Sequence, residues 1–281
     1  MKKLILMIGL LALAGVADAG TLKRIADSGE IKIGYRAATE PFSFQDAEGK
    51  ATGYSVELCQ RIAEAVRTEL KRDNLKITYV PVTLEERFDA VASKKVDLLC
   101  SATTITLSRL EKVDFSLLTF VTGGSLMSRS NAPIQTTSEL AGKKVAVISG
   151  TTTEAALADY LKENFIDATT VAADSIEAAR NLLAQGEVDA VADDQIVLIG
   201  QIIASGTPKD FTLAQDLFSY EPYGLALARD DGEFRLVVDR TLARIYRTGQ
   251  FKELYSKWFL RFGLKPTPIL QAMYKLQGLP E

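Results

Sequence analysis

The feature that most restricts the fold is a pattern of residues that occurs twice. The two copies are FDAVASKKVDLLCSATT, which starts at Phe88, and ARNLLAQGEVDAVADDQ, which starts at Ala179. Each runs from an amphipathic helical stretch through a tight turn and a Val-Asp pair into an apolar strand, and then becomes abruptly polar. The likeness lies in the pattern more than in identical residues. It favours two similar lobes, each with strands and helices in alternation.

The hydrophobic periodicity of the sequence around each copy of the pattern predicts the other strands and helices of that lobe. In the first lobe, strands are expected at 31–34, 77–82 and 96–100, and helices at 57–70 and 84–92. In the second, strands are expected at 145–148, 169–172 and 188–192, and helices at 153–164 and 175–185. The fold class is therefore α/β, with an open sheet flanked by helices in each lobe.

The remaining segments are assigned to connections and to the end of the chain. The β-rich stretch 118–127 would carry the chain into the second lobe, and 218–228 would bring it back. Helices are expected at 235–248 and 251–262, with Trp258 and Phe259 in the core, and 266–281 is expected to be an extension on the surface. The predicted division is a signal peptide at 1–19, a first lobe made of 20–120 and 222–281, and a second lobe at 121–221.

The amino-terminal residues predict export. Lys2 and Lys3 precede an apolar run at 4–16, and Ala17-Asp18-Ala19 places small residues where a signal peptidase cleaves, before Gly20. The apolar run is shorter than the roughly 20 residues that a transmembrane helix needs, and no cysteine follows it to carry a lipid. We therefore expect a soluble periplasmic protein.

Charge and composition exclude several functions. Loss of the signal would change the formal net charge from −3 to −4 by removing two lysines and one aspartate, so electrostatics do not favour nucleic-acid binding. The chain has no histidine, which excludes histidine-based triads and removes the commonest transition-metal ligand. No metal site and no cofactor are expected. Cys59 and Cys100 could form a disulfide if the helix of the first covers the strand of the second; we slightly favour two free buried thiols.

Polar residues gather where the expected strands end. Arg36 follows the first strand, Ser101 to Thr106 and then Arg109 follow the third, 149–153 follows the first strand of the second lobe, and Asp193-Asp194 follows its last. In open α/β sheets, ligands bind beyond the carboxyl ends of strands. We therefore expect these groups to meet in one cleft between the lobes.

These groups match the two ends of a zwitterion. Arg109 suits a carboxylate, and the helix that begins after Gly150 offers free N–H groups to the same anion. Asp193 or Asp194 can accept hydrogen bonds from an ammonium group. Each also has an ordinary structural explanation: the threonines and the aspartates can simply cap helices, and Arg109 can be a solvated surface charge. Their joint placement at strand ends in both lobes favours the binding site.

At these residues the chain resembles a known family. The stretches CSATTITLSRLEKVDFS, VISGTTTE and VADDQ, with GYRAATEPFSF, GYSVEL and TGQFKELYSKWF, resemble the family-3 periplasmic solute-binding proteins of amino-acid ABC transporters. The resemblance covers nearly the whole chain after the signal. It implies the type II periplasmic-binding-protein fold, in which crossing strands join two lobes that close over a ligand by a hinge motion.

The resemblance also implies roles for individual residues. Arg109 matches the arginine that clamps the ligand's α-carboxylate. Thr104 matches a hydroxyl residue that either assists this clamp or holds the ammonium group. Thr151 and Thr152 match the contribution of the opposite lobe to the same carboxylate. Asp194 matches the aspartate that takes the α-ammonium group.

Specificity for the ligand's side chain depends both on residues that match the glutamate/aspartate-binding subgroup of this family and on residues that differ from it. Arg36 and Arg87 correspond to two arginines of the glutamate/aspartate-binding subgroup, which favours an acidic side chain. Ala102 stands where a serine is frequent, so any contact there has to come from the backbone. Leu84 replaces another serine of that subgroup, and Ser175 is placed at the position of its histidine. A less polar pocket, or one built for another ligand, stays open.

The predicted function is the binding of an amino acid, with glutamate or aspartate favoured, and its delivery to an ABC permease by a monomeric protein that catalyses no reaction. Two alternatives remain. The first is an enzyme resembling cyclohexadienyl dehydratase, which has a similar scaffold and eliminates water and carbon dioxide from its substrate. The second is a sensor that presents its closed form to a membrane receptor instead of a permease.

Overall fold

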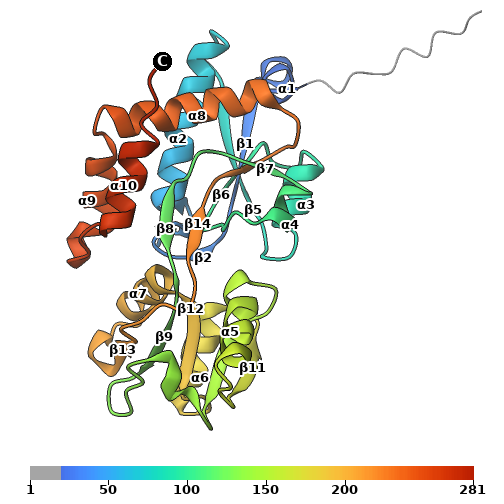
Figure 1. Ribbon diagram of the computed structural model, residues 1–281. Helices are drawn as coiled ribbons and strands as arrows, with labels where there is room; N and C mark the ends of the chain where they lie inside the picture. Colours follow the sequence, from blue (N-terminus) through green and yellow to red (C-terminus); the bar gives the residue numbers. More distant parts are fainter. Residues whose placement is uncertain (1–19) are drawn as a thin grey trace, which may run out of the picture.

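The computed structural model describes residues 20–281, apart from the side chain of Arg261, as two lobes that each contain one five-stranded sheet (Figure 1). The predicted signal peptide, residues 1–19, lies outside the described residues. Helices flank both sheets, so the predicted α/β fold class with two lobes is confirmed.

The first sheet has the strand order β5-β1-β6-β15-β7. These strands are β1 (Glu30–Tyr35), β5 (Lys76–Pro81), β6 (Leu98–Cys100), β7 (Asp114–Phe115) and β15 (Ala226–Leu227). The strand β1 is parallel to β5 and β6, whereas β15 is antiparallel to β6 and β7. The carboxyl ends of the parallel strands therefore lie at one edge of the sheet.

The second sheet repeats this design in the order β11-β10-β12-β9-β13. Its strands are β9 (Gly124–Arg129), β10 (Lys144–Ile148), β11 (Thr169–Ala173), β12 (Ala190–Asp194) and β13 (Phe211–Leu213). Here β10 is parallel to β11 and β12, and β9 is antiparallel to β12 and β13. Each sheet thus has parallel strands in its first three places and antiparallel pairing in the last two.

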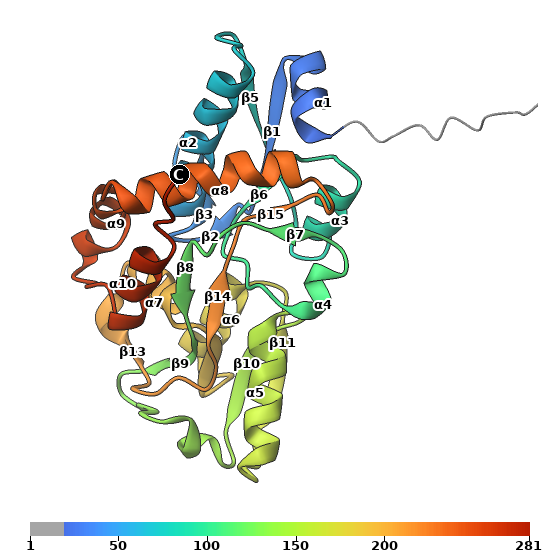
Figure 2. The same ribbon diagram turned by 45° about the horizontal axis from the view of Figure 1, so that its top comes forward.

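The helices divide between the lobes. The first lobe carries α1 (Thr21–Ser28), α2 (Tyr54–Glu69), α3 (Arg87–Ala92), α4 (Leu107–Leu110), α8 (Gly232–Arg247), α9 (Phe251–Trp258) and α10 (Pro268–Leu276). It also carries a small sheet of β2 (Ala38–Thr39), β3 (Ser43–Gln45) and β4 (Ala51–Thr52). The second lobe carries α5 (Thr152–Glu163), α6 (Ile176–Gln185) and α7 (Gln195–Ala204). Figure 2 shows α8 lying across the first lobe.

The Val-Asp pair of the repeated pattern has the same structural role in both lobes. The Asp97 carboxylate accepts a hydrogen bond from the backbone N–H of Lys32 (2.8 Å), and the Asp189 carboxylate accepts one from the backbone N–H of Lys144 (2.9 Å). Each aspartate therefore fixes the start of the central parallel strand beside it. This shared contact explains why both copies place an aspartate directly before the apolar strand.

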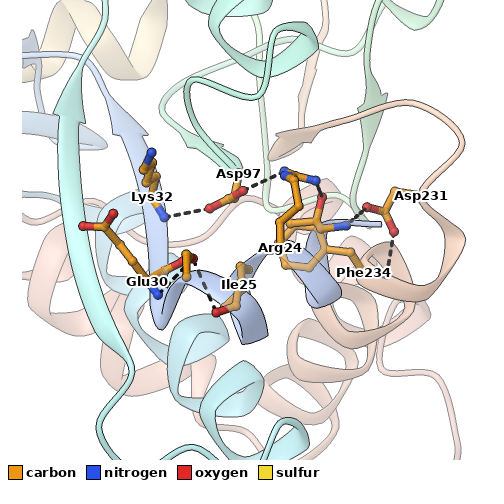
Figure 3. A network of polar contacts seen from close by, with 9 residues as sticks. Arg24, Ile25, Glu30, Lys32, Asp97, Asp231 and Phe234 are labelled. Carbon is orange, nitrogen blue, oxygen red and sulfur yellow. Dashed lines mark hydrogen bonds and ion pairs between the residues drawn. The ribbon is translucent and has the colours of Figure 1, made fainter. Parts of the chain in front are cut away.

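Polar contacts also tie the start of the described chain to its late helices (Figure 3). The Asp231 carboxylate accepts hydrogen bonds from the backbone N–H groups of Thr21 (2.6 Å) and Phe234 (3.2 Å). Arg24 on α1 donates to Asp97 over 2.9 Å. The helix α1 is thereby held against both α8 and the first sheet.

Two strands connect the lobes. They are β8 (Phe120–Thr122) and β14 (Glu221–Tyr223), which pair antiparallel with each other between the sheets (Figure 1). We propose that the lobe boundaries lie in these strands, at the positions predicted from the sequence near residues 120 and 222.

The carboxyl-terminal segment differs from the prediction. Residues 266–281 were expected to lie on the surface, but α10 inserts Leu270, Met273 and Tyr274 into the core. The Tyr274 hydroxyl lies 2.9 Å from that of the buried Tyr54 on α2. Pro268 occupies the first turn of the helix, where proline is well tolerated.

The two cysteines also differ from the prediction. Cys59 on α2 and Cys100 at the end of β6 form a disulfide, with Cα atoms 6.3 Å apart. The preference for two free thiols was therefore wrong. The sequence did not reveal that α2 packs over β6 with these two side chains facing each other.

Removal of this disulfide is expected to destabilise the protein. The bond closes a loop with a sequence separation of 41 residues, for which loop-closure entropy gives about 4 kcal/mol. The double substitution Cys59→Ala and Cys100→Ala should lower the free energy of unfolding by roughly this amount in urea denaturation. Equal stability of this variant and the oxidised wild type would contradict the structure.

Candidate functional site

A cavity lies between the lobes, where the carboxyl ends of the parallel strands of both sheets face each other. Every residue predicted for the site lines it. The predicted residues are Arg36, Arg87, Ala102, Thr104, Arg109, Thr151, Thr152 and Asp194. The other lining residues are Ala38, Thr39, Leu84, Ile148, Thr153, Ile176, Asp193 and Val197.

Arg109 belongs to the short helix α4, whose cap is Thr106. Its guanidinium group donates to the backbone carbonyl of Thr104 (2.6 Å) and lies 5.2 Å from the centroid of the Phe88 ring. Burial lowers the pKa of Arg109, while the charges of Glu221 and Asp194 raise it. The guanidinium is thus fixed in place and retains donors for an anion in the cavity.

Arg87 and Arg36 bring further positive charge into the same cavity. Arg87, the first residue of α3, donates to the carbonyl of Leu84 and lies 4.5 Å from the Phe88 ring centroid. Burial, followed by the charges of Arg109 and Arg36, lowers the pKa of Arg87 to about 9. These arginines repel one another, and a bound anion would relieve that repulsion.

The amino terminus of α5 faces the cavity from the second lobe. Thr151 caps the helix: its hydroxyl accepts from the backbone N–H of Glu154 (3.1 Å) and donates to the carbonyl of Ile148 (2.8 Å). The Glu154 carboxylate in turn accepts from the N–H of Gly150 (2.8 Å). Helix capping, the structural explanation, therefore accounts for the Thr151 hydroxyl. The other backbone N–H groups of the first turn remain the groups suited to an anion.

The two lobes meet directly at the cavity. The Thr152 hydroxyl, at the start of α5, donates to the hydroxyl of Thr104 in the first lobe over 3.3 Å. Gly200 on α7 is so close to the first lobe that a Cβ atom added there would lie 2.5 Å from the backbone oxygen of Glu40. The structure thus has the lobes brought together.

Asp194 ends β12 and is 7% exposed. Its carboxylate accepts hydrogen bonds from the hydroxyls of Thr153 (2.9 Å) and Tyr223. Burial is the main cause that raises the pKa of Asp194, and the neighbouring charges of Asp193 and Glu221 raise it further. Burial also raises the pKa of Asp193, while the charge of Arg36 lowers it. A cation placed beside Asp194 would stabilise its ionised form.

The cavity carries a formal charge that can be counted. The cationic side chains are Arg36, Arg87 and Arg109, and the anionic ones are Asp193 and Asp194. With all of them ionised the sum is +1, so a ligand of net charge −1 would neutralise it. Apolar side chains complete the walls.

Sequence reasoning placed one position wrongly and missed others. Ser175, aligned with a histidine of the glutamate/aspartate-binding subgroup, does not line the cavity; it caps α6 by accepting from the N–H of Ala178 (3.1 Å). Ile176 is the lining residue there. Asp194 is held by Thr153, which lay in the predicted stretch 149–153 without a role of its own, and by Tyr223, which was not predicted. Thr153 could have been found from the sequence, because its hydroxyl directly follows two candidate threonines. The sequence gives no such signal for Tyr223, because this residue is distant in sequence from the strand ends of both lobes.

Among the described residues, no cluster of acidic or cysteine side chains has the geometry of a metal site. Within residues 20–281, no helix is both long enough and apolar enough to cross a membrane.

The comparison with protein families agrees with the geometry. The family of bacterial extracellular solute-binding proteins, family 3, matches residues 31–261. The L-glutamate/L-aspartate-binding protein of Pseudomonas aeruginosa is 34% identical over 253 residues, which cover 89% of this chain and 84% of that protein. The glutamate/aspartate import solute-binding protein of Escherichia coli is 30% identical over 246 residues, covering 88% and 82%.

A solved structure shows the same fold. An ancestral amino acid-binding protein, described as a precursor of cyclohexadienyl dehydratase, superposes with a TM-score of 0.73 at 28% identity. The match covers 86% of this chain and all of the other.

Proposed function

The chain belongs to the bacterial extracellular solute-binding proteins, family 3, and we propose that it binds glutamate or aspartate between its lobes and delivers it to an ABC permease. The site of action would be the periplasm, in keeping with the predicted signal peptide. The observation that carries this proposal is the meeting of Arg109 and Asp194, from opposite lobes, in one cavity.

The α-amino acid portion of a ligand fits between these two side chains. Arg109 and the first turn of α5 offer donors to the α-carboxylate, and Asp194 offers acceptors to the α-ammonium group. Ala102 has no polar side-chain atom, so a contact at this position would come from its backbone. Exclusion of water between the lobes would strengthen each of these charged contacts.

The remaining arginines of the cavity and the related proteins both support a ligand with an acidic side chain. Arg36 and Arg87 are available to a second carboxylate once Arg109 is engaged. The formal charge of +1, reached in the cavity when Asp194 is ionised beside an ammonium group, matches an acidic amino acid of net charge −1. The relatives from P. aeruginosa and E. coli are named for glutamate and aspartate. Leu84 and Ile176 make the walls less polar but leave both arginines in place.

Calorimetry with a matched set of ligands tests this proposal. Glutamate, aspartate, glutamine, asparagine and arginine should be titrated into protein from which bound ligand has been removed by unfolding and refolding. We expect glutamate or aspartate to bind at least about 100-fold more tightly than the corresponding amide, because the amide leaves buried arginine unpaired. Preference for a neutral or basic amino acid would refute the acidic assignment.

The substitution Arg36→Ala is expected to reduce this selectivity. Loss of one charged contact to the side-chain carboxylate should weaken glutamate and aspartate about 10- to 100-fold, whereas binding of glutamine should change little. Calorimetry measures the dissociation constants for glutamate and glutamine, and their ratio reports the selectivity. Arg72→Ala, which removes an exposed arginine outside the cavity, is the matched control. An unchanged ratio would mean that Arg36 does not contact the ligand's side chain.

An enzymatic role is the second candidate, because one structural relative is a precursor of cyclohexadienyl dehydratase. The relatives named for binding and import support a function without catalysis. Incubation of the protein with prephenate or arogenate separates the two: we expect no product above the uncatalysed background. The same relatives support a permease, instead of a membrane sensor, as the partner that receives the ligand.

A further inference from the structure

Tyr223 connects the site to the strands that join the lobes. It ends β14 and is 1% exposed. Its backbone carbonyl accepts from the N–H of Thr119 (2.8 Å), and it forms an isolated bridge with Thr104 in the first lobe. Its ring packs edge-on against Phe42, with centroids 5.3 Å apart. Both the main chain and the ring of Tyr223 are therefore fixed by the first lobe.

The hydroxyl of this fixed ring reaches across to the second lobe. It donates to Oδ2 of Asp194, while the Thr153 hydroxyl donates to Oδ1 over 2.9 Å. Each oxygen of the carboxylate thus has one protein donor and a remaining lone pair. Thr104 continues the connection, because its carbonyl accepts from the Arg109 guanidinium (2.6 Å).

From these contacts we infer that Tyr223 is a positioning residue, which holds the Asp194 carboxylate in place for the ligand's ammonium group and ties it to the framework that carries Arg109. The inference rests on the proposed function for the identity of the ligand. The contact itself can be tested without any ligand.

The Tyr223 hydroxyl also affects the pKa of Asp194. Asp193 on the same strand and Glu221 on β14 both raise the pKa of Asp194, in addition to burial, while the hydrogen bonds from Tyr223 and Thr153 lower it. The charge of Asp194 in turn raises the pKa of Arg109 on α4. Burial raises the pKa of Tyr223 well above its usual value, so the phenol stays neutral and donates. Without it, Asp194 would hold its proton to a higher pH.

The variant Tyr223→Phe isolates this contact, because it retains the ring that packs against Phe42 and removes only the oxygen. Tyr54→Phe is the matched control. Tyr54 is fully buried, but its hydroxyl lies near the Thr119 carbonyl (3.0 Å) and the Tyr274 hydroxyl (2.9 Å) and makes no contact with Asp194. Any general cost of removing a buried phenol oxygen should be seen in both variants.

The first measurement uses the protein without ligand. Aspartate side-chain carboxyl carbons labelled with ¹³C are titrated by NMR, and the Asp194 resonance is assigned from its absence in Asp194→Asn. We expect the midpoint of Asp194 to rise by about one pH unit in Tyr223→Phe, the shift for loss of a hydrogen bond to a charged group. Tyr54→Phe should leave it unchanged. An unmoved midpoint in Tyr223→Phe overturns the inference, whichever ligand the protein binds.

The second measurement uses glutamate and glutarate, its analogue without the amino group. In Tyr223→Phe, glutamate should weaken about tenfold near pH 7, less near pH 9, and glutarate should change little. Equal losses for both ligands at every pH would mean that the hydroxyl supports the structure in general and not Asp194. Failure of wild type to bind glutamate would count against the proposed function alone.

Discussion

The variant Arg109→Ala is expected to bind glutamate and aspartate much more weakly, with affinity reduced about 30- to 3,000-fold. Truncating one partner of a buried, hydrogen-bonded charge pair costs about 2–5 kcal/mol, and each 1.4 kcal/mol is about tenfold in affinity. Arg109 is the arginine that the Thr104 carbonyl and the Phe88 ring fix at the cavity. We expect Arg36 and Arg87 not to restore this contact, because both are proposed to contact the side-chain carboxylate of the ligand.

This loss should be specific to binding. Arg109 lies in the four-residue helix α4, which has no buried residue, so the thermal unfolding temperature without ligand should stay close to that of wild type. Calorimetry gives the affinity and circular dichroism gives the stability. Arg72→Ala serves again as the control on the surface. Unchanged affinity in Arg109→Ala would count against the whole site, because the other assigned residues are defined by their position around it.

The variant Asp194→Asn should weaken amino acids far more than the corresponding acids without an amino group. We expect a loss of about 30-fold or more for glutamate, since the ammonium group would face a neutral amide in a buried site. Glutarate has no ammonium group and should bind with nearly unchanged affinity. Equal losses for the two ligands would show that Asp194 does not meet the ammonium group.

A substitution at the other end of the same strand provides the control. Asp189 directly precedes β12 and accepts from the backbone N–H of Lys144 (2.9 Å) outside the cavity. Asp189→Asn should therefore lower stability slightly and leave the ratio of glutamate to glutarate affinity as in wild type. A change of this ratio in both variants would indicate a general effect on β12 instead of a contact with the ligand.

The same carboxylate predicts how binding depends on pH. Its pKa is raised by burial, and a bound ammonium group would lower it, so ligand binding is expected to release a proton. Affinity for glutamate should therefore fall as the pH drops below the raised pKa of Asp194. In Asp194→Asn this dependence should flatten, which titrations in a series of buffers would show.

Much of the fold followed from the repeated pattern. The Val-Asp pairs predicted equivalent strands in two lobes, and Asp97 and Asp189 prove to fix those strands through the same backbone contact. Because the polar residues follow strands that are parallel in each sheet, their meeting at one cavity could also be predicted. That prediction needed only the direction of the strands and no knowledge of side-chain contacts.

What failed depended on packing between segments that are distant in sequence. The disulfide required α2 to cover β6 with Cys59 facing Cys100, and α10 became part of the core because Tyr274 meets Tyr54. Neither pairing has a local signal. The hydroxyl of Tyr223 was missed for the same reason, since a strand joining the lobes reaches the site from outside both copies of the pattern.

The most direct test of the central claim is a crystal structure of the protein with glutamate bound. The account predicts one glutamate between the lobes, with its α-carboxylate on Arg109, its ammonium group on Asp194 and its side-chain carboxylate toward Arg36 and Arg87. Density for glutamate elsewhere, or in this cavity with Arg109 and Asp194 contacting neither end of it, would contradict the account.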